Sequence, residues 1–308
     1  MAERTERVPI SAIVHTRDSE RTVEQTLKSV AFADEIVVVD MESTDGTVAI
    51  ARTLATAVHS VAPVPRVDSI RNEWIQRLRH EWILVVDSDE CLAEDAAEEV
   101  QRVIARHGER YDAVALPRFD RVAGQILRGS GWYPDHQIRL FRKGTVRWGD
   151  TIHRLPEVVT GPHRLLELEP PDCVHLHHRN YEDLRHFVAK QLEYALRDRP
   201  PADPEGFDFT DYVARAYERL ALRGDAERDG DLSHALALLL AWDQIVRGLL
   251  HWDSLDPRPP LDLLGALPIA TERVPWWRVR ARRWLGRRHS LGYYARRAFE
   301  IYRDWRSR

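Results

Sequence analysis

Apolar residues recur in two alternating patterns along the first 110 residues of the chain. Short, nearly continuous apolar runs are typical of strands that are buried on both faces of a parallel sheet. Such runs cover residues 10–14, 35–39, 58–61 and 82–86. Between the runs, apolar residues fall three and four positions apart, which predicts helices with one buried face. Strands that alternate with helices in this order predict an α/β, Rossmann-like fold with a mostly parallel central sheet flanked by helices.

The pattern changes near residue 111, where short strands and loops replace the regular alternation. Helical spacing then returns over residues 181–197, 208–223 and 231–251. Prolines mark the stretch that follows, and the chain ends in a segment rich in arginine and aromatic residues from Trp276. We therefore expect a catalytic domain over residues 1–180, a helical extension over residues 181–251, and a linker with a helical tail over residues 252–308.

The bulk composition is that of a soluble globular protein. Of 308 residues, 44% are hydrophobic and 31% are charged, shares that suit a folded chain with a buried core. The formal net charge of −4 argues against a nucleic-acid-binding protein, because no positive field covers the whole chain. Two cysteines cannot form a disulfide framework and fit a reducing compartment. Neither a signal peptide nor an apolar stretch of ~20 residues is visible, so we expect a cytoplasmic protein.

The arginine- and tryptophan-rich tail has two interpretations. Basic residues mixed with aromatic ones can rest on an anionic membrane, which would place the protein at the inner face of that membrane. The same residues can also pack on the domain through their aromatic rings and leave the arginines in solvent. The composition favours packing and leaves peripheral membrane contact open.

Two carboxylates follow the apolar run at residues 82–86, one residue apart. Because side chains alternate along a strand, Asp87 and Asp89 point to the same side. Like charges at the mouth of a buried sheet are costly unless a cation neutralises them. Carboxylate oxygens suit Mg²⁺ and Mn²⁺, and Mg²⁺ commonly shares its coordination shell with substrate phosphates. The sequence therefore predicts Mg²⁺ or Mn²⁺ together with a diphosphate here, with plain solvation of the strand end as the alternative.

A second polar strand end lies at residues 40–47. Asp40 follows a run of apolar residues, and its carboxylate can accept a hydrogen bond from a ligand, for example from the ring N–H of a pyrimidine. Asp45 precedes Gly46 and Thr47, so a helix N-cap is the simpler interpretation of that residue.

In order and spacing, these motifs resemble the family 2 glycosyltransferases of the GT-A fold. Within that family, the chain is most similar to the lipopolysaccharide-core glucosyltransferases of the WaaE/KdtX type. The matching stretches are residues 33–40, 43–47, 71–72, 82–90 and the Gly-Trp-Tyr-Pro-Asp-His-Gln-Ile-Arg-Leu-Phe-Arg run at 131–142. The resemblance covers roughly residues 8–195.

The resemblance implies inverting transfer of a sugar from a nucleotide diphosphate, usually UDP, to an acceptor hydroxyl. By position, Asp40 would contact the base, Asp87 the ribose or diphosphate, and Arg71 the phosphates. The full set of candidate donor-binding residues is Thr16, Asp18, Asp40, Asp45, Arg71 and Asp87. The candidate metal ligands are Asp89, Glu90 and His177, the last chosen from the three histidines at positions 175, 177 and 178.

Inverting transfer needs a carboxylate that takes the proton of the acceptor hydroxyl, and Asp135 is the candidate base. Trp132 and Tyr133 precede it and are suited to packing on a sugar face, so they are candidate acceptor residues together with His153. A plain Pro134-Asp135 turn is the alternative.

The chain departs from its relatives in two places. Relatives usually carry a glutamate where this chain has Arg154, and they tend to carry Asn-Glu where it has Asp18-Ser19. The first departure keeps a rival hypothesis open, a catalytically silent sugar-nucleotide-binding protein. A nucleotidyltransferase would need a glycine-rich phosphate loop after the first strand, which residues 15–20 lack. The donor sugar, the base and the acceptor stay open, including lipid-linked saccharide, natural-product and peptide acceptors.

Overall fold

The computed structural model describes residues 7–129, 131–149, 156–170, 173–198, 200–223 and 226–261. These residues belong to two compact units. The first unit comprises residues 1–120 and 135–180, and the second comprises residues 121–134 and 181–308.

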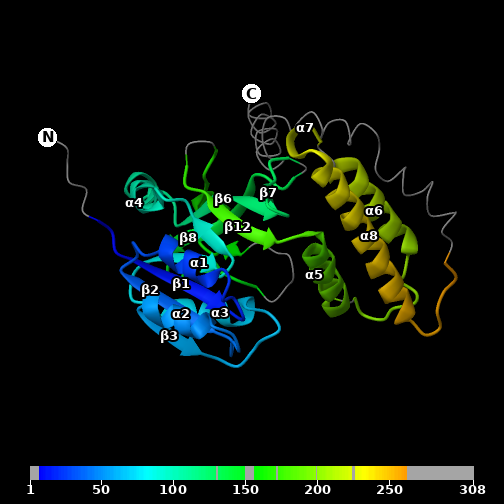
Figure 1. The fold of residues 1–308 in the computed structure, drawn as a ribbon, viewed down its shortest axis with the longest axis horizontal. Coiled ribbons are helices and arrows are strands. Elements are labelled where there is room, and N and C mark those ends of the chain that lie inside the picture. Colours follow the sequence, from blue (N-terminus) through cyan, green and yellow to red (C-terminus); the bar gives the residue numbers. More distant parts are fainter. Residues whose placement is uncertain are drawn as a thin grey trace. The chain divides into compact units, whose positions relative to one another are not determined.

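The first unit is built on one mixed sheet (Figure 1). Its parallel part runs in the order β3 (Ala57–Ser60), β2 (Glu35–Asp40), β1 (Ile10–Thr16) and β4 (Trp82–Asp87). The sheet continues through β8 (Asp135–Arg142), β6 (Ala113–Val122), β12 (Leu176–Tyr181) and β5 (Glu90–Leu92), and β11 (Leu165–Glu167) also pairs with β6. The helices are α1 (Val23–Ser29), α2 (Thr47–Leu54), α3 (Asp68–Arg77) and α4 (Ala96–His107). A small ladder of β9 (Val146–Arg147) and β10 (Glu157–Val158) precedes the 3₁₀ turn η1 (Pro162–Arg164).

Parallel pairing brings the carboxyl ends of three strands to one edge of the sheet. Thr16 of β1 pairs with Asp40 of β2, and His15 of β1 pairs with Asp87 of β4. In open α/β sheets this edge is where ligands bind. The predicted α/β class is confirmed, and β8 adds an antiparallel strand next to β4.

Hydrophobic side chains from alternate strand positions form two clusters, one on each face of the sheet. Ala12 and Val14 of β1 belong to one cluster, which also contains residues of α1 and α4. Ile13 belongs to the other, which contains Trp74 and Ile75 of α3. The same alternation continues to the strand end, so it directs the His15 side chain toward the α3 face.

The second unit consists mainly of helices, as the predicted C-terminal extension requires. These are α5 (Leu184–Arg197), α6 (Phe209–Arg223), α7 (Ala226–Asp229) and α8 (Asp231–Asp253), with the short strand β7 (Gln125–Ile126). Residues 121–134 belong to this unit, although the sequence pattern placed them in the first. The functional boundaries at residues 180 and 251 stay a prediction.

In the described part of the chain, no helix combines the length and the apolar character that crossing a membrane requires. The tail from Trp276 lies outside the described residues, so its packing and its membrane contact both stay predictions.

Helices α6 and α8 approach closely at Gly248. A Cβ atom at this position would lie 2.7 Å from Cε2 of Phe209 and 2.8 Å from Cγ of Tyr212. The Tyr212 hydroxyl and Nδ1 of His251 are also 2.9 Å apart, which links the two helices next to this contact.

We predict that Gly248→Ala lowers the free energy of unfolding by about 1–3 kcal/mol, because the added methyl group overpacks the two rings. An alanine at a relaxed helical position would instead gain up to ~1 kcal/mol over glycine. Urea unfolding measures the difference, with Leu238→Ala as the control, since that side chain is 61% exposed on the same helix. A stabilised Gly248→Ala protein would contradict the close approach.

Candidate active site

The centre of the site is a chain of ion pairs at the tip of β4. Asp87 accepts a hydrogen bond from Arg71 of α3 at 2.6 Å and another from Arg139 of β8. Partial burial alone would raise the pKa of Asp87, but Arg139 and Arg71 outweigh that effect and hold the pKa well below its usual range. Asp87 is therefore an anion at any physiological pH.

Glu90 of β5 is buried and points toward arginines. Its carboxylate accepts hydrogen bonds from Nη1 of Arg118 at 2.8 Å and from Nη2 and Nε of Arg139 at 2.8 and 3.0 Å. The backbone N–H of Asp87 donates to the same carboxylate at 3.2 Å. These donors occupy both carboxylate oxygens, and we interpret Glu90 as the residue that holds the two arginines. Its predicted role as a metal ligand stays untested.

Arg118 of β6 connects this buried pair to the candidate base. Its Nε and Nη2 donate to Oδ2 of Asp135 at 3.1 and 2.5 Å, while Gln137 donates to Oδ1 at 3.0 Å. A third of the Asp135 side chain is exposed. Asp135 is thus fixed in place by a bidentate guanidinium contact and still reaches solvent.

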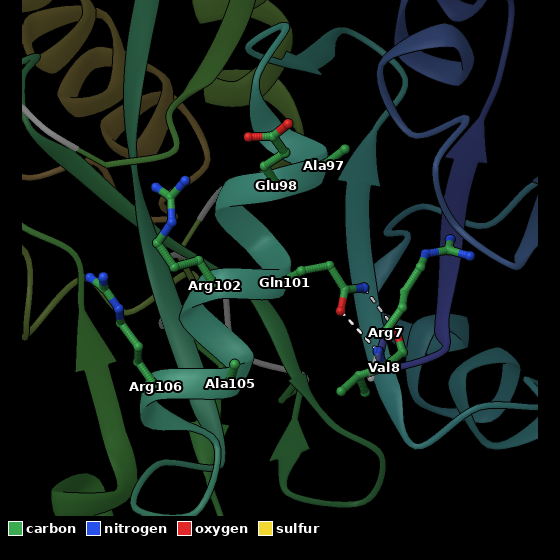
Figure 2. Close-up of a pocket in the computed structure, with 8 residues that line it drawn as sticks. All are labelled: Arg7, Val8, Ala97, Glu98, Gln101, Arg102, Ala105 and Arg106. Atoms are coloured by element: carbon green, nitrogen blue, oxygen red, sulfur yellow. Dashed lines mark hydrogen bonds between the residues drawn. The ribbon is translucent and has the colours of Figure 1, made fainter. Parts of the chain in front are cut away.

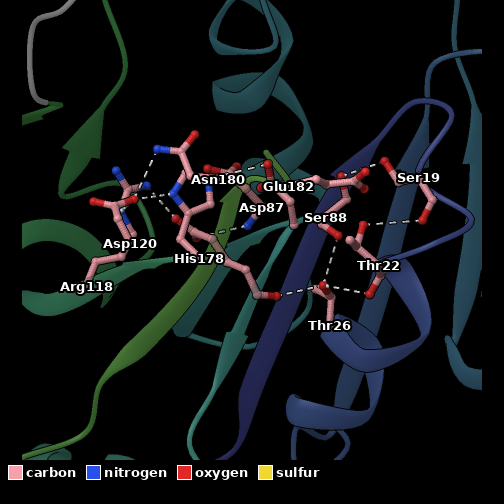
Figure 3. Close-up of polar contacts among 12 residues, drawn as sticks. Ser19, Thr22, Thr26, Asp87, Ser88, Arg118, Asp120, His178, Asn180 and Glu182 are labelled. Atoms are coloured by element: carbon pink, nitrogen blue, oxygen red, sulfur yellow. Dashed lines mark hydrogen bonds and ion pairs between the residues drawn. The ribbon is translucent and has the colours of Figure 1, made fainter. Parts of the chain in front are cut away.

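The second carboxylate of the predicted metal site, Asp89, lies beside His178 of β12. Nε2 of His178 is 3.4 Å from Oδ2 of Asp89, and Nδ1 is 2.7 Å from Oδ1 of Asp120. Figure 3 shows the His178 ring next to Asp120 and Asn180. Burial alone would lower the pKa of His178, but the hydrogen bonds to Asp120 and Asp89 outweigh it and raise the pKa to about 9.

The structure brings His178, rather than His177, next to the acids. Along β12 the side chains alternate, and the ring of His177 lies 5.6 Å from the ring of Phe119, while His175 stacks on that ring at 4.8 Å. In the pairing of β12 with β5, His178 is opposite Glu90. The three histidines lie within four positions of the sequence, and only the strand register shows which of them lies beside the acids. A metal-ligand role for His177 stays untested.

Two of the candidate donor residues, Asp18 and Asp40, join the loops that follow β1 and β2. Asp40 accepts hydrogen bonds from the Ser43 amide at 3.0 Å and hydroxyl at 2.5 Å. Asp18 accepts one from the Thr44 amide at 2.8 Å. These contacts shape the rim of the carboxyl edge, and the donor roles of both residues stay predictions.

Asp45 accepts hydrogen bonds from the amides of Glu20 and Thr47, both at 3.0 Å. Thr47 is the first residue of α2 and Gly46 is its N-cap, so Asp45 is not the N-cap that the sequence suggested. From one position earlier it still satisfies an orphan amide of the first turn. Its predicted contact with the donor stays untested.

Buried polar atoms without a hydrogen-bond partner occur near the end of β1, on His15 (both ring nitrogens), Thr16 (Oγ1) and Arg71 (Nε). Nε1 of Trp132, in the second unit, is a further such atom among the described residues. Leaving such a group unsatisfied costs about 1–3 kcal/mol, so water or a ligand at this edge would stabilise the protein. Thr16 and Arg71 were predicted from the sequence, whereas His15 was missed.

His15 is held neutral by its surroundings. Burial, and then the nearby Arg71 guanidinium, lower the pKa of His15 to about 3, although Asp87 acts in the opposite direction. The sequence feature that could have identified His15 is its place two residues after Ile13 on β1. Strand alternation puts both side chains on the face of the sheet that carries Asp87 and α3.

Arg71 has a further partner that the sequence did not reveal. Its guanidinium carbon lies 5.3 Å from the ring centroid of Trp148, within the range of a cation–π contact. The neighbouring Asn72 donates to the Trp148 carbonyl at 2.8 Å and accepts from the Trp148 amide at 2.9 Å. The Arg71-Asn72 pair therefore fixes both the ring and the backbone of Trp148.

The predicted acceptor residues are divided between parts of the chain. Trp132 and Tyr133 belong to the second unit, where Trp132 packs against a cluster that contains Phe187. His153 and Arg154 lie outside the described residues. The acceptor roles of Trp132, Tyr133 and His153 stay predictions.

Two other features of the first unit do not overlap the candidate site. A hollow of about 610 Å³ lies where α4 meets residues 7 and 8, and it is lined by Arg7, Val8, Ala97, Glu98, Gln101, Arg102, Ala105 and Arg106 (Figure 2). A separate group of possible cation ligands, His136, Glu167 and Glu169, places one ligand atom of each residue within 4.8 Å of the others. Neither feature contains a predicted donor or metal residue.

Comparison with known proteins gives one family match. Residues 11–155 match the model of a family described as glycosyl transferase family 2. An uncharacterized glycosyltransferase of Rickettsia typhi is 30% identical over 153 residues, which are 47% of this chain. The chain covers half the length of that relative.

Solved structures to which the chain is similar include the following two. The mannosyltransferase PcManGT from Pyrobaculum calidifontis, in complex with GDP-Man and Mn²⁺, has a TM-score of 0.44 at 16% identity, covering 90% of this chain and 83% of that one. Residues 1–349 of S. aureus TarS, in complex with UDP-GlcNAc, have a TM-score of 0.41 at 19% identity, covering 89% and 84%. Both scores are below 0.5, so neither likeness bears on what this chain binds.

We predict that Arg139→Met destabilises the protein by about 3–5 kcal/mol, because it leaves the Asp87 and Glu90 carboxylates without their shared cation. The matched control is Arg147→Met, which removes an ion pair to Glu157 whose two side chains are 65% and 63% exposed and which changes stability by less than about 1 kcal/mol. Urea unfolding of both variants provides the comparison. Equal effects would show that the buried network contributes no more than a surface pair.

Proposed function

We propose, from the match of residues 11–155 to the glycosyl transferase family 2 model, that the protein transfers a sugar from a nucleoside diphosphate to an acceptor hydroxyl with inversion at the anomeric carbon. The observation that carries the proposal is the convergence of Asp87, Asp89 and His178 at the carboxyl edge of the sheet. Buried polar atoms without partners lie at the same edge.

The donor half of the proposed site comprises Thr16, Arg71 and Asp87. Arg71 carries a permanent charge, which suits a diphosphate, and its Nε has no protein partner. Asp87 pairs with both Arg71 and Arg139, so it holds these guanidinium groups in fixed positions. We propose that the diphosphate binds along this face, with Asp40 at the base and Asp18 and Asp45 in the loops that enclose it.

The residues present fit a divalent cation between the donor and the protein. We propose Asp89 as one ligand and His178 as the second, in place of Glu90 and His177, because a carboxylate oxygen and an imidazole nitrogen face each other at 3.4 Å. When bound, Mg²⁺ or Mn²⁺ would neutralise the charge that develops on the departing nucleoside diphosphate. Both ions accept oxygen ligands, and Mn²⁺ also accepts imidazole.

The proposed base is Asp135, which accepts the proton of the attacking hydroxyl. Arg118 and Gln137 fix the orientation of its carboxylate. The contacts with Arg118 and Gln137 leave the lone pairs of Asp135 that face solvent to receive the proton.

The finer features of the proposal rest on the sequence. The run at residues 131–142 favours the WaaE/KdtX type and a UDP-sugar donor, and the acceptor is a saccharide, a lipid-linked saccharide or a natural product. We place the reaction in the cytoplasm, with peripheral membrane contact through the tail as a further expectation.

A catalytically silent sugar-nucleotide-binding protein is the second candidate. Arg154 stands where relatives carry a glutamate, and the Asp135 carboxylate is bound by a guanidinium group. Such a protein would bind a nucleotide sugar tightly and release no nucleotide.

The first test is UDP release from UDP-sugars, with water as the acceptor. We predict slow release that EDTA stops and that Mn²⁺ or Mg²⁺ restores, and we predict that Asp89→Asn abolishes the metal-dependent part. Asp68→Asn is the matched control, because that carboxylate also lies near Arg71 (3.8 Å) but outside the proposed metal site. Tight binding without release would favour the silent protein.

The second test concerns the base. We predict that Asp135→Asn lowers kcat by about 10²–10⁴-fold, the usual contribution of a general base, while the affinity for the donor stays within a few-fold. Glu157→Gln serves as a control because Glu157 is an exposed carboxylate of the same unit. An unchanged kcat would assign proton transfer to another residue, and a loss of donor binding alone would assign Asp135 to the donor half.

A further inference from the structure

Asp120 is a buried carboxylate that the proposed chemistry does not use directly. It lies on β6 with 2% of its surface exposed, one strand away from the metal candidates. Its Oδ1 is 2.7 Å from Nδ1 of His178 and accepts a hydrogen bond from Nδ2 of Asn180 at 3.2 Å. Nε of Arg118 is 3.9 Å away. Figure 3 shows this group on the neighbouring strands β6 and β12.

The two ring nitrogens of a neutral histidine have different roles. One carries the proton and donates, and the other holds a lone pair that can bind a cation. In His178 the nitrogen next to Asp120 is Nδ1, and the nitrogen next to Asp89 is Nε2. A carboxylate accepts hydrogen bonds but donates none, so Asp120 selects the tautomer with the proton on Nδ1. The raised pKa of His178 puts a proton on Nε2 as well at neutral pH, and loss of that proton on cation binding would leave the Nε2 lone pair directed toward Asp89.

We propose that Asp120 is a positioning residue that fixes the tautomer and ring orientation of His178 so that Nε2 can bind the divalent cation. The inference rests on the proposed function, because it assumes a cation at Asp89. Carboxylates that hold metal-bound histidines in this way typically change metal affinity by 10–100-fold when they are removed. The alternative is that Asp120 only ties β12 to β6 through Asn180.

The experiment measures Mn²⁺ affinity of the full chain in the presence of UDP, from the loss of the electron paramagnetic resonance signal of free Mn²⁺. The variants are Asp120→Ala, His178→Ala and the double variant. We expect Asp120→Ala to weaken Mn²⁺ binding by about 10–100-fold. In the His178→Ala background the same change should have no further effect, because Asp120 acts through the imidazole.

A second readout separates positioning from folding. Spin-echo spectra of bound Mn²⁺ should show the coupling of an imidazole nitrogen in the wild type, and Asp120→Ala should reduce it. Asp120→Asn retains an oxygen that accepts the hydrogen bond from Nδ1 of His178, so this variant should keep most of the coupling. It also replaces Asp120 with a side chain of the same size, so we expect it to fold if Asp120→Ala does not. Asn180→Ala is the matched control, since it removes the other hydrogen bond to Asp120 and should leave Mn²⁺ affinity unchanged.

Three results would overturn the inference. Unchanged Mn²⁺ affinity in both Asp120 variants would mean that the residue only links strands β6 and β12. A loss of Mn²⁺ affinity that persists in the His178→Ala background would mean that Asp120 acts only through its charge. A loss in Asn180→Ala as large as in Asp120→Ala would also assign the effect to the link between strands. Asp89→Asn distinguishes these outcomes from failure of the proposed function, because unchanged Mn²⁺ binding in that variant rejects the metal site itself.

Discussion

The site depends on one buried cation, the guanidinium group of Arg139, which bridges Asp87 and Glu90 at the tip of β4. Two carboxylates this close in a buried place would repel each other and lose their hydration. Arg139 and its neighbour Arg118 remove that cost and fix both acids in space. The proposed donor half, through Asp87, and the proposed base half, through Arg118 and Asp135, are therefore parts of one ion-pair network.

This network also explains why a further cation is expected. It contains more carboxylates than guanidinium groups, and the acids at its open end, Asp89 and Asp135, each keep about a third of their side chain exposed. The buried acids are neutralised by arginine, whereas Asp89 faces His178, which is positively charged only while its Nε2 proton is bound. The proposed position of the exchangeable ion is therefore beside Asp89 at the mouth of the sheet, outside the buried ion pairs.

The fold could be predicted because strand and helix periods differ, and the apolar run that ends at Asp87 located the edge of the sheet where the candidate site lies. Register could not be read from the sequence, so only the structure shows that His178 is the histidine beside Asp89. The metal-ligand role predicted for His177 stays untested. Glu90 was grouped with the metal ligands because its partners, Arg118 and Arg139, lie 28 and 49 residues away. His15 and Trp148 were missed for the same reason, since their partners are distant in the chain.

The most direct test of the central claim is a crystal of the protein soaked with Mn²⁺ and UDP, with the manganese located by anomalous scattering. The account predicts one strong peak in contact with an oxygen of Asp89, Nε2 of His178 and the diphosphate. A peak at His136, Glu167 and Glu169 instead, or no manganese beside Asp89 when UDP is bound, would contradict it.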